Sequence, residues 1–518
     1  MQIKLALIAL ITSTPCVTAQ DAPLSAIDWL AVQRSAPTEV LTLPPVEETP
    51  TAQSAAVPEV DVLPLDAPVI GGVGLLPSSM TGLPTTLWQN SSEEDVVAAI
   101  EALQSRKATV PALDALFHTL LLAEAAPPNG SDGLDLLQTR VAVLQERGLV
   151  SPAEALLERA GDLSPDLFAQ AFDLALLTGS DEALCQALNA APSLSNDLAT
   201  RIWCATRDGD FSRAVTIFQT ATALDQLSDL DEELLLRFLD PEYAETASPL
   251  RNPVRPTPLQ FRLFEAVGEA LPTTPLPLPF AVVELNGDAG WRAQISAAER
   301  LARAGTLDGN QLLGIYTLQQ PAASGGVWDR VAAFQQFESA LAAGDAADIS
   351  NTLERVWPQM RVAGLLVPFS ELFAAQLADV PLTGRAKTYA RYAGVLSSRY
   401  ETTAVSLAET DDAAMQGLAQ IAMGQSPNDA SDTIPHLPAF IAAWSQPPKA
   451  DAPLVTLSQD GGLGIALLRT IALFDDGASG NDADLGEALQ ALRALGLEDT
   501  ARRAALQLAI LKMEGALR

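Results

Sequence analysis

Gly-Asp-Phe-Ser-Arg-Ala-Val-Thr-Ile-Phe-Gln-Thr-Ala, residues 209–221, is the stretch of sequence that decides the fold. The Gly209-Asp210 pair predicts a turn that opens a helix, because aspartate is a favoured first residue of a helix and glycine a favoured turn residue. Ala214, Phe218 and Ala221 follow Gly209 by five, nine and twelve positions. Small residues in a helix let a neighbouring helix pack closely against it. The stretch therefore predicts part of a helix-turn-helix unit.

This spacing of small residues and one aromatic resembles the second helix of a tetratricopeptide (TPR) repeat, in which the aromatic fills the groove beside a neighbouring helix. Gly148, Gly179 and Gly209 are 31 and 30 residues apart, close to the period of about 34 residues in that family. Gly344-Asp345 repeats the opening, with Leu353 at the place of the aromatic. The resemblance implies an all-α, TPR-like solenoid of helix hairpins in two blocks, with a concave surface that binds protein.

Length and composition agree with an array of helices. The chain has 518 residues, of which 48% are hydrophobic but only 5% aromatic, and the apolar residues are mostly Ala and Leu, which favour helices. It carries 64 acids and 31 bases, for a net charge of -33. Charge of this sign repels phosphate backbones, so we expect no nucleic-acid partner. Dispersed acids favour solubility or a cationic partner.

Residues 1–19 have the pattern of a secretory signal. Lys4 supplies a positive charge, Leu5–Ile11 an apolar core, and Val17-Thr18-Ala19 a cleavage site. The apolar core is too short to span a membrane, and no later stretch reaches about 18 uninterrupted apolar residues. We therefore expect an exported protein of the periplasm without a transmembrane segment.

Two cysteines would remain after cleavage, Cys185 and Cys204. The middle of the stretch between them falls in residues 192–196, which read as a turn between two helices, so the thiols would lie level in an antiparallel hairpin. The sequence predicts a disulfide that stabilises this helix pair by about 3 kcal/mol. Two unbonded buried thiols on different faces are the alternative.

Residues 20–87 contain ten prolines, which oppose regular helices and central strands and predict an extended tether. Ile27, Trp29 and Leu30 belong to an apolar island at 26–32 that we expect to dock into a groove, either of a partner or of the protein itself. Residues 69–83 are apolar enough that we expect them to pack along the helical body.

Helix start and stop signals divide the rest of the chain. They predict an N-terminal helical block at 88–242, a Pro-rich hinge at 243–290, a second block at 291–424, a loop at 425–460 and a C-terminal helical cap at 461–518. In the hinge, one helix is expected at 259–271, whereas 280–285 fits either a strand or a helical turn. The last helix, at 498–511, is expected to have the polar face that closes a solenoid.

Candidate catalytic residues are scarce. His118 lies in an apolar helix and His436 lies between prolines, and no metal, nucleophile or nucleotide motif is present. We predict no catalytic, cofactor-binding or metal-binding residue. Residues 461–464, Gly-Gly-Leu-Gly, lack the lysine of a phosphate loop, so a turn that starts a helix explains them. A mechanism that uses only carboxylates stays open, because glycosidic cleavage needs one or two acids.

Four stretches resemble uncharacterised exported proteins of marine alphaproteobacteria: residues 26–30, 81–84 with Trp88, 323–330 and 497–503. Helical accessory proteins of flagellar motors in that class are similar in size, which implies a stator or rotor-associated envelope protein as partner. We interpret the chain as a non-enzymatic periplasmic scaffold for protein–protein interaction, with Ile27, Trp29, Leu30 and Phe218 as docking residues. The alternatives are a cell-wall enzyme or its regulator, similar to the superhelices of lytic transglycosylases, and a binder of solutes or peptides.

Overall fold

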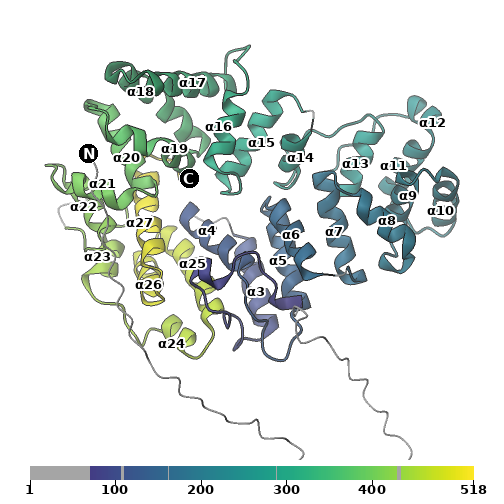
Figure 1. Cartoon of the computed structure of the whole chain (residues 1–518), viewed down its shortest axis with the longest axis horizontal. Helices are drawn as coiled ribbons and strands as arrows, with labels where there is room; N and C mark the ends of the chain where they lie inside the picture. Colours follow the sequence, from purple (N-terminus) through teal and green to yellow (C-terminus); the bar gives the residue numbers. More distant parts are fainter. Residues whose placement is uncertain (1–69, 107–109, 162, 288, 429–432, 518) are drawn as a thin grey trace, which may run out of the picture. The chain divides into compact units, whose positions relative to one another are not determined.

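The computed structural model describes residues 70–106, 110–161, 163–287, 289–428 and 433–517. Over these residues it contains 26 α-helices, two short 3₁₀ helices and no strand, apart from one isolated bridge between Leu76 and Ala123 (Figure 1). The all-α prediction is confirmed. None of these helices has both the length and the apolar character needed to cross a membrane. The predicted signal at 1–19 and the apolar island at 26–32 lie outside the described residues.

The described part begins with η2 (Ile70–Gly72) and α2 (Ser78–Thr81) and continues into a first row of helices: α3 (Glu93–Gln104), α4 (Pro111–Leu122), α5 (Leu134–Glu146), α6 (Val150–Ala160) and α7 (Pro165–Thr178). We call the next group the outer helices: α8 (Glu182–Ala190), η3 (Pro192–Leu194), α9 (Leu198–Arg207), α10 (Phe211–Ala223), α11 (Asp229–Leu239) and α12 (Pro241–Thr246). The middle helices are α13 (Pro258–Ala266), α14 (Phe280–Asn286), α15 (Trp291–Arg303), α16 (Gly309–Thr317), α17 (Val327–Ala343) and α18 (Ala346–Ala363). The last helices are α19 (Leu366–Ala378), α20 (Gly384–Leu396), α21 (Tyr400–Ala408), α22 (Ala413–Ala422), α23 (Leu437–Ser445), α24 (Pro453–Gln459), α25 (Leu463–Ala478), α26 (Asp482–Ala494) and α27 (Glu498–Met513).

Both Gly-Asp turns form as predicted. Gly209 and Gly344 have left-handed backbones, with φ of 80° and 79°, which residues with a side chain rarely adopt. The Asp210 carboxylate accepts a hydrogen bond from the Arg213 N–H at 3.0 Å and starts α10. Asp345 caps α18 in the same way. Consecutive helices such as α9 and α10, or α17 and α18, then pack against each other as hairpins.

Residues 70–90 pack along the first row, as expected for residues 69–83. Arg140 of α5 is fully buried there and donates hydrogen bonds to three backbone carbonyls, those of Val73 at 2.8 Å, Leu121 at 2.6 Å and Ala123 at 3.1 Å. Burial lowers the pKa of Arg140 to about 10, so it stays charged at neutral pH. These carbonyl oxygens therefore accept the hydrogen bonds of the buried Arg140 guanidinium. The guanidinium in turn links residues 70–76 to the end of α4.

The last helices pack against the first and close the array. α25 contacts α3, and α27 contacts α4. The Ala112 N–H donates a hydrogen bond to Gln507 Oε1 at 2.8 Å, and Arg106 pairs with Asp476 at 2.6 Å. The expectation of a polar face on the last helix was wrong, because α20, α22 and α26 also pack on α27 and bury its residues 504–511.

The predicted hinge holds two complete helices, α13 and α14, and the end of α12. α13 and α14 both pack on α7, with Leu263, Phe264 and Phe280 buried. Residues 280–286 form a helix and not a strand. α13 ends before the predicted limit at residue 271, because Gly268 adopts a left-handed backbone with φ of 81°.

Candidate protein-binding face

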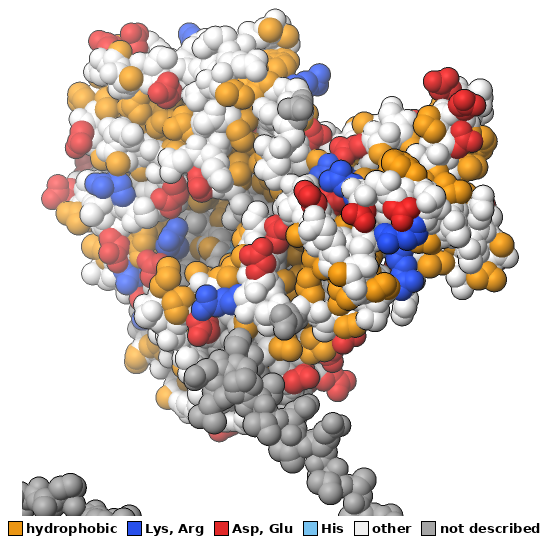
Figure 2. All heavy atoms as spheres, turned by 45° about the vertical axis from the view of Figure 1, so that its right-hand side comes forward, with side chains coloured by type: hydrophobic (Ala, Val, Ile, Leu, Met, Phe, Trp, Pro, Cys, Tyr) orange, Lys and Arg blue, Asp and Glu red, His pale blue; other side chains and the backbone are white. Residues whose placement is uncertain are grey.

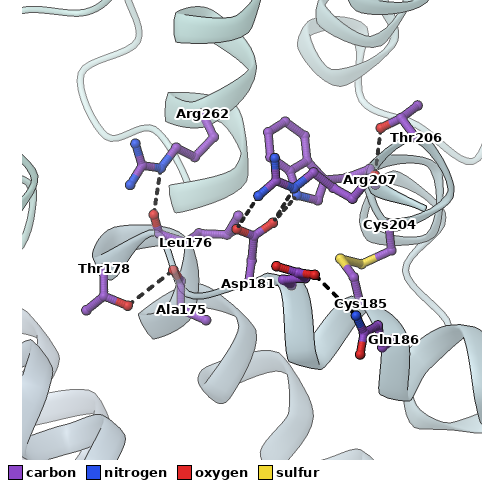
Figure 3. Close-up of polar contacts among 12 residues, drawn as sticks. Ala175, Leu176, Thr178, Asp181, Cys185, Gln186, Cys204, Thr206, Arg207 and Arg262 are labelled. Atoms are coloured by element: carbon purple, nitrogen blue, oxygen red, sulfur yellow. Dashed lines mark hydrogen bonds and ion pairs between the residues drawn. A yellow bond between two sulfur atoms is a disulfide. The ribbon is translucent and has the colours of Figure 1, made fainter. Parts of the chain in front are cut away.

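A disulfide holds together the hairpin at the start of the outer helices. Cys185 of α8 and Cys204 of α9 are bonded, with η3 as the turn between the two helices, as the sequence predicts (Figure 3). Asp181, just before α8, is buried and accepts a hydrogen bond from Trp203 Nε1 at 2.8 Å. Its carboxylate also lies 3.2 Å from Arg207. The start of α8 is thereby tied to the end of α9.

A second contact ties the end of α7, directly before the outer helices, to the middle helices. Arg262 of α13 donates a hydrogen bond from Nε to the Leu176 carbonyl at 2.6 Å, near the end of α7 (Figure 3). A cation near the last carbonyls of a helix interacts favourably with the helix dipole. Glu265 forms an ion pair with the same guanidinium at 2.7 Å. The Arg262 side chain therefore bonds the Leu176 carbonyl through Nε and the Glu265 carboxylate through Nη1.

Helix α10 carries an exposed apolar stripe. Phe211 and Val215 are 58% and 36% exposed, and Phe218 is half-buried. These positions are separated by four and then three residues, which places them on one face of a helix. Ala214 and Ala221 are fully buried beside them, where α10 contacts its neighbours α9 and α11. We call Phe211, Val215 and Phe218 the α10 face.

The α10 face is uncharged. Arg213 is the one charged residue within α10, and its side chain hydrogen-bonds Asn189 and lies 3.8 Å from the Asp210 carboxylate. Hydrogen bonds from the Arg213 N–H and the Ser212 hydroxyl keep the pKa of Asp210 below its ordinary value. In Figure 2, hydrophobic and uncharged side chains lie along the right-hand edge of the molecule, below a group of acidic side chains at its upper right.

Of the predicted docking residues, Phe218 belongs to the α10 face, whereas Ile27, Trp29 and Leu30 lie outside the described residues. Phe218 does not fill a groove completely, because it is only half-buried. Sequence reasoning missed Phe211 and Val215. Their spacing from Phe218 is the signal that could have revealed them, since apolar residues at helical intervals form a second stripe beside the buried alanines.

A hollow of about 480 Å³ lies where the ends of α3, α5, α15 and α27 meet. The charged side chains in its wall are paired with protein groups. Arg147 lies 2.8 Å from Asp114, and Arg303 donates a hydrogen bond to the Ala363 carbonyl at 2.8 Å. A second hollow, of about 440 Å³, also has Arg303 in its wall. Neither hollow offers an unpaired arginine to a ligand.

The two histidines have different surroundings. His118 is buried in α4, and burial followed by the charge of Arg147 lowers its pKa to about 4. Its Nε2 has no hydrogen-bond partner among the described residues. His436 directly precedes α23, and its Nδ1 lies 2.6 Å from Asp482 Oδ1. His118 is therefore a neutral core residue at physiological pH.

One carboxyl group has a strongly raised pKa. Burial, followed by the charge of Asp197, raises the pKa of Asp173 to about 7. Asp197 caps α9 and accepts a hydrogen bond from the Thr200 N–H at 2.9 Å. Asp173 lines neither of the hollows described above. No cluster of three or more His, Cys, Asp or Glu suited to a metal ion occurs within the described residues.

Comparisons with models of protein families, with curated proteins and with solved structures find no match for this chain. The fold and the site define a class by themselves: an all-α protein built as an array of helix hairpins, with an uncharged apolar face on its outer helices.

Proposed function

We propose that this protein is a non-enzymatic scaffold that binds another protein through the α10 face. The observation that supports this proposal is the exposure of Phe211, Val215 and Phe218 along two turns of one helix, without a charge among them. Burying apolar surface on association is favourable by about 25 cal/mol per Å². Phenylalanine is also enriched in the buried core of protein interfaces.

The partner we propose presents the apolar side of an amphipathic helix. The α10 face extends about 10 Å along the helix axis, which matches two turns of a helix laid beside it. The disulfide and the contacts of Asp181 restrain α9, on which α10 packs. A face that is already ordered loses little conformational entropy on binding, so three side chains can contribute most of their burial energy.

We further propose that the protein acts in the periplasm on an envelope protein, such as a stator or rotor-associated component of a flagellar motor. The pattern of residues 1–19 supports export, and the Cys185–Cys204 disulfide suits an oxidising compartment. The resemblance to motility accessory proteins supports the choice of partner.

Photo-cross-linking in cells tests the α10 face. A cross-linker at position 215 should capture one envelope protein, whereas a cross-linker at Thr216, an exposed polar neighbour, should not. Phe211→Asp should abolish the capture from position 215. The purified captured protein should then bind the wild-type chain and bind Phe211→Asp about tenfold or more weakly.

Equal capture from positions 215 and 216, or capture that is insensitive to Phe211→Asp, would contradict the proposal for the α10 face. A deletion strain tests the choice of partner separately. Unchanged motility in that strain would remove the flagellar assignment and leave the α10 face as a binding site for another envelope protein.

A further inference from the structure

The stretch from Val380 to Tyr400 is positively charged, whereas the chain as a whole is strongly negative. This stretch contains four bases and no acid, in a chain with 64 acids and 31 bases. Three of these bases, Lys387, Arg391 and Arg399, line one hollow of about 540 Å³ between α19, α20 and α21. A strongly acidic protein thus has a cationic site in one place.

The three cations come from two neighbouring elements. Lys387 and Arg391 are four residues apart on α20, so both lie on the same side of that helix. Arg399 directly precedes α21. Gly394 allows the two helices to approach, because a Cβ at this position would come within 2.5 Å of Thr403 Oγ1. In the rest of the wall, Leu377, Val380 and Leu382 are apolar, whereas Thr402, Thr403 and Ser406 carry hydroxyl groups.

None of these three side chains has a hydrogen bond or ion pair with any residue that the structure describes. Two nearby acids are engaged elsewhere. Glu371 lies 3.2 Å from Arg503, and Glu401 lies 2.8 Å from Arg502. Like charges around one hollow repel one another, and a bound anion would remove that cost.

We propose that this hollow binds a small organic anion that carries two or more phosphate or carboxylate groups. A ligand with one negative charge would leave part of the positive charge of Lys387, Arg391 and Arg399 unbalanced, whereas a ligand with two or three negative charges would neutralise it. Arginine binds both groups through paired N–H donors. The apolar part of the wall would accept the carbon body of the ligand, and the volume lies within the range of small-molecule sites. This site is separate from the α10 face and does not depend on its function.

Isothermal titration calorimetry of the full chain at low ionic strength tests the site, with pyrophosphate and citrate as probes and sucrose as an uncharged control. Arg391→Gln and Arg399→Gln should each weaken binding about tenfold or more, because each removes a charged hydrogen-bond donor. Arg355→Gln, which removes an exposed arginine of α18 that does not line the hollow, should leave binding unchanged. Added salt should weaken binding of the anions in the wild type.

Binding of pyrophosphate alone would identify a phosphate ligand and binding of citrate alone a polycarboxylate, and either result supports the site. Absence of binding by both anions would overturn it, as would an equal loss in all three variants or equal binding of sucrose. Thermal melting of each variant shows whether the fold is retained. Lys387→Gln provides a further variant in case one arginine substitution prevents folding.

Discussion

The indole ring of Trp88 lies directly against Gly464, so that a Cβ on Gly464 would come within 2.2 Å of Trp88 Cζ3. The Gly464 N–H also donates a hydrogen bond to the Leu87 carbonyl at 3.0 Å. This contact joins the segment before α3 to the start of α25, at the place where the array closes. Close packing therefore explains the glycine at position 464.

We expect Gly464→Ala to destabilise the protein by about 1–3 kcal/mol, because the added methyl group overlaps the Trp88 ring and forces the two segments apart. Urea denaturation measures this change in the free energy of unfolding. Gly314→Ala is a matched control, since Gly314 lies within α16 with open space where its Cβ would be. The control should be neutral or slightly stabilising, and an equal loss in both variants would contradict the packing argument.

Removal of the Cys185–Cys204 disulfide should lower stability by about 3 kcal/mol, because the unfolded chain regains the entropy of a closed loop. The double variant Cys185→Ala, Cys204→Ala and the wild type with reductant should unfold at similar urea concentrations. The reductant should have no effect on the double variant. A wild-type midpoint that does not change with reductant would contradict the prediction.

His118 should make the protein less stable in mild acid. Its folded pKa of about 4 lies below the ordinary 6.5, so the unfolded chain binds a proton that the folded protein does not bind between these values. Stability should therefore fall as the pH drops from 6.5 towards 4, by up to about 3 kcal/mol. In His118→Leu, denaturation curves across this window should show a shallower loss. The same slope in both proteins would contradict this assignment.

Asp173 should have the opposite dependence on pH. Its folded pKa of about 7 lies above the ordinary 3.8, so the stability it contributes is complete below pH 3.8 and is lost as the pH rises through 7. Asp173→Asn, which cannot ionise, should gain about 1–3 kcal/mol over the wild type between about pH 4.5 and pH 8. Asp166→Asn changes an exposed acid in the first turn of the same helix. That control should shift stability by less than about 0.5 kcal/mol, and a larger gain there would contradict the role of burial.

Local signals predicted most helices well. α20 begins at Gly384 and ends at Leu396, and Ser92 caps α3 by accepting a hydrogen bond from the Asp95 N–H. Two other helices have weaker local signals. α21 is rich in Thr and Val, which lower helix propensity, and it forms because Ala404 and Leu407 are buried. α24 has only seven residues, too few to show a helical period.

The candidate sites were only partly predictable. The absence of acids between residues 380 and 400 is visible in the sequence, but the pairing of Glu371 and Glu401 with other arginines is not. A cation attracts an anionic ligand more strongly where no protein carboxylate pairs with it. Whether a nearby carboxylate pairs with a given cation depends on side chains from different helices, so the composition of the stretch alone does not reveal these pairings.

The sequence by itself determined where many of the helices begin and end and which two cysteines a hairpin brings together, because caps and turns act over a few residues. Only the tertiary structure decided that the last helices close onto the first and which apolar side chains stay exposed. Phe218 and Leu353 each follow the glycine of a Gly-Asp turn by nine positions, yet Leu353 is fully buried and Phe218 is half-exposed. The difference arises because burial depends on which distant helices pack against a position, and the local sequence does not contain that information.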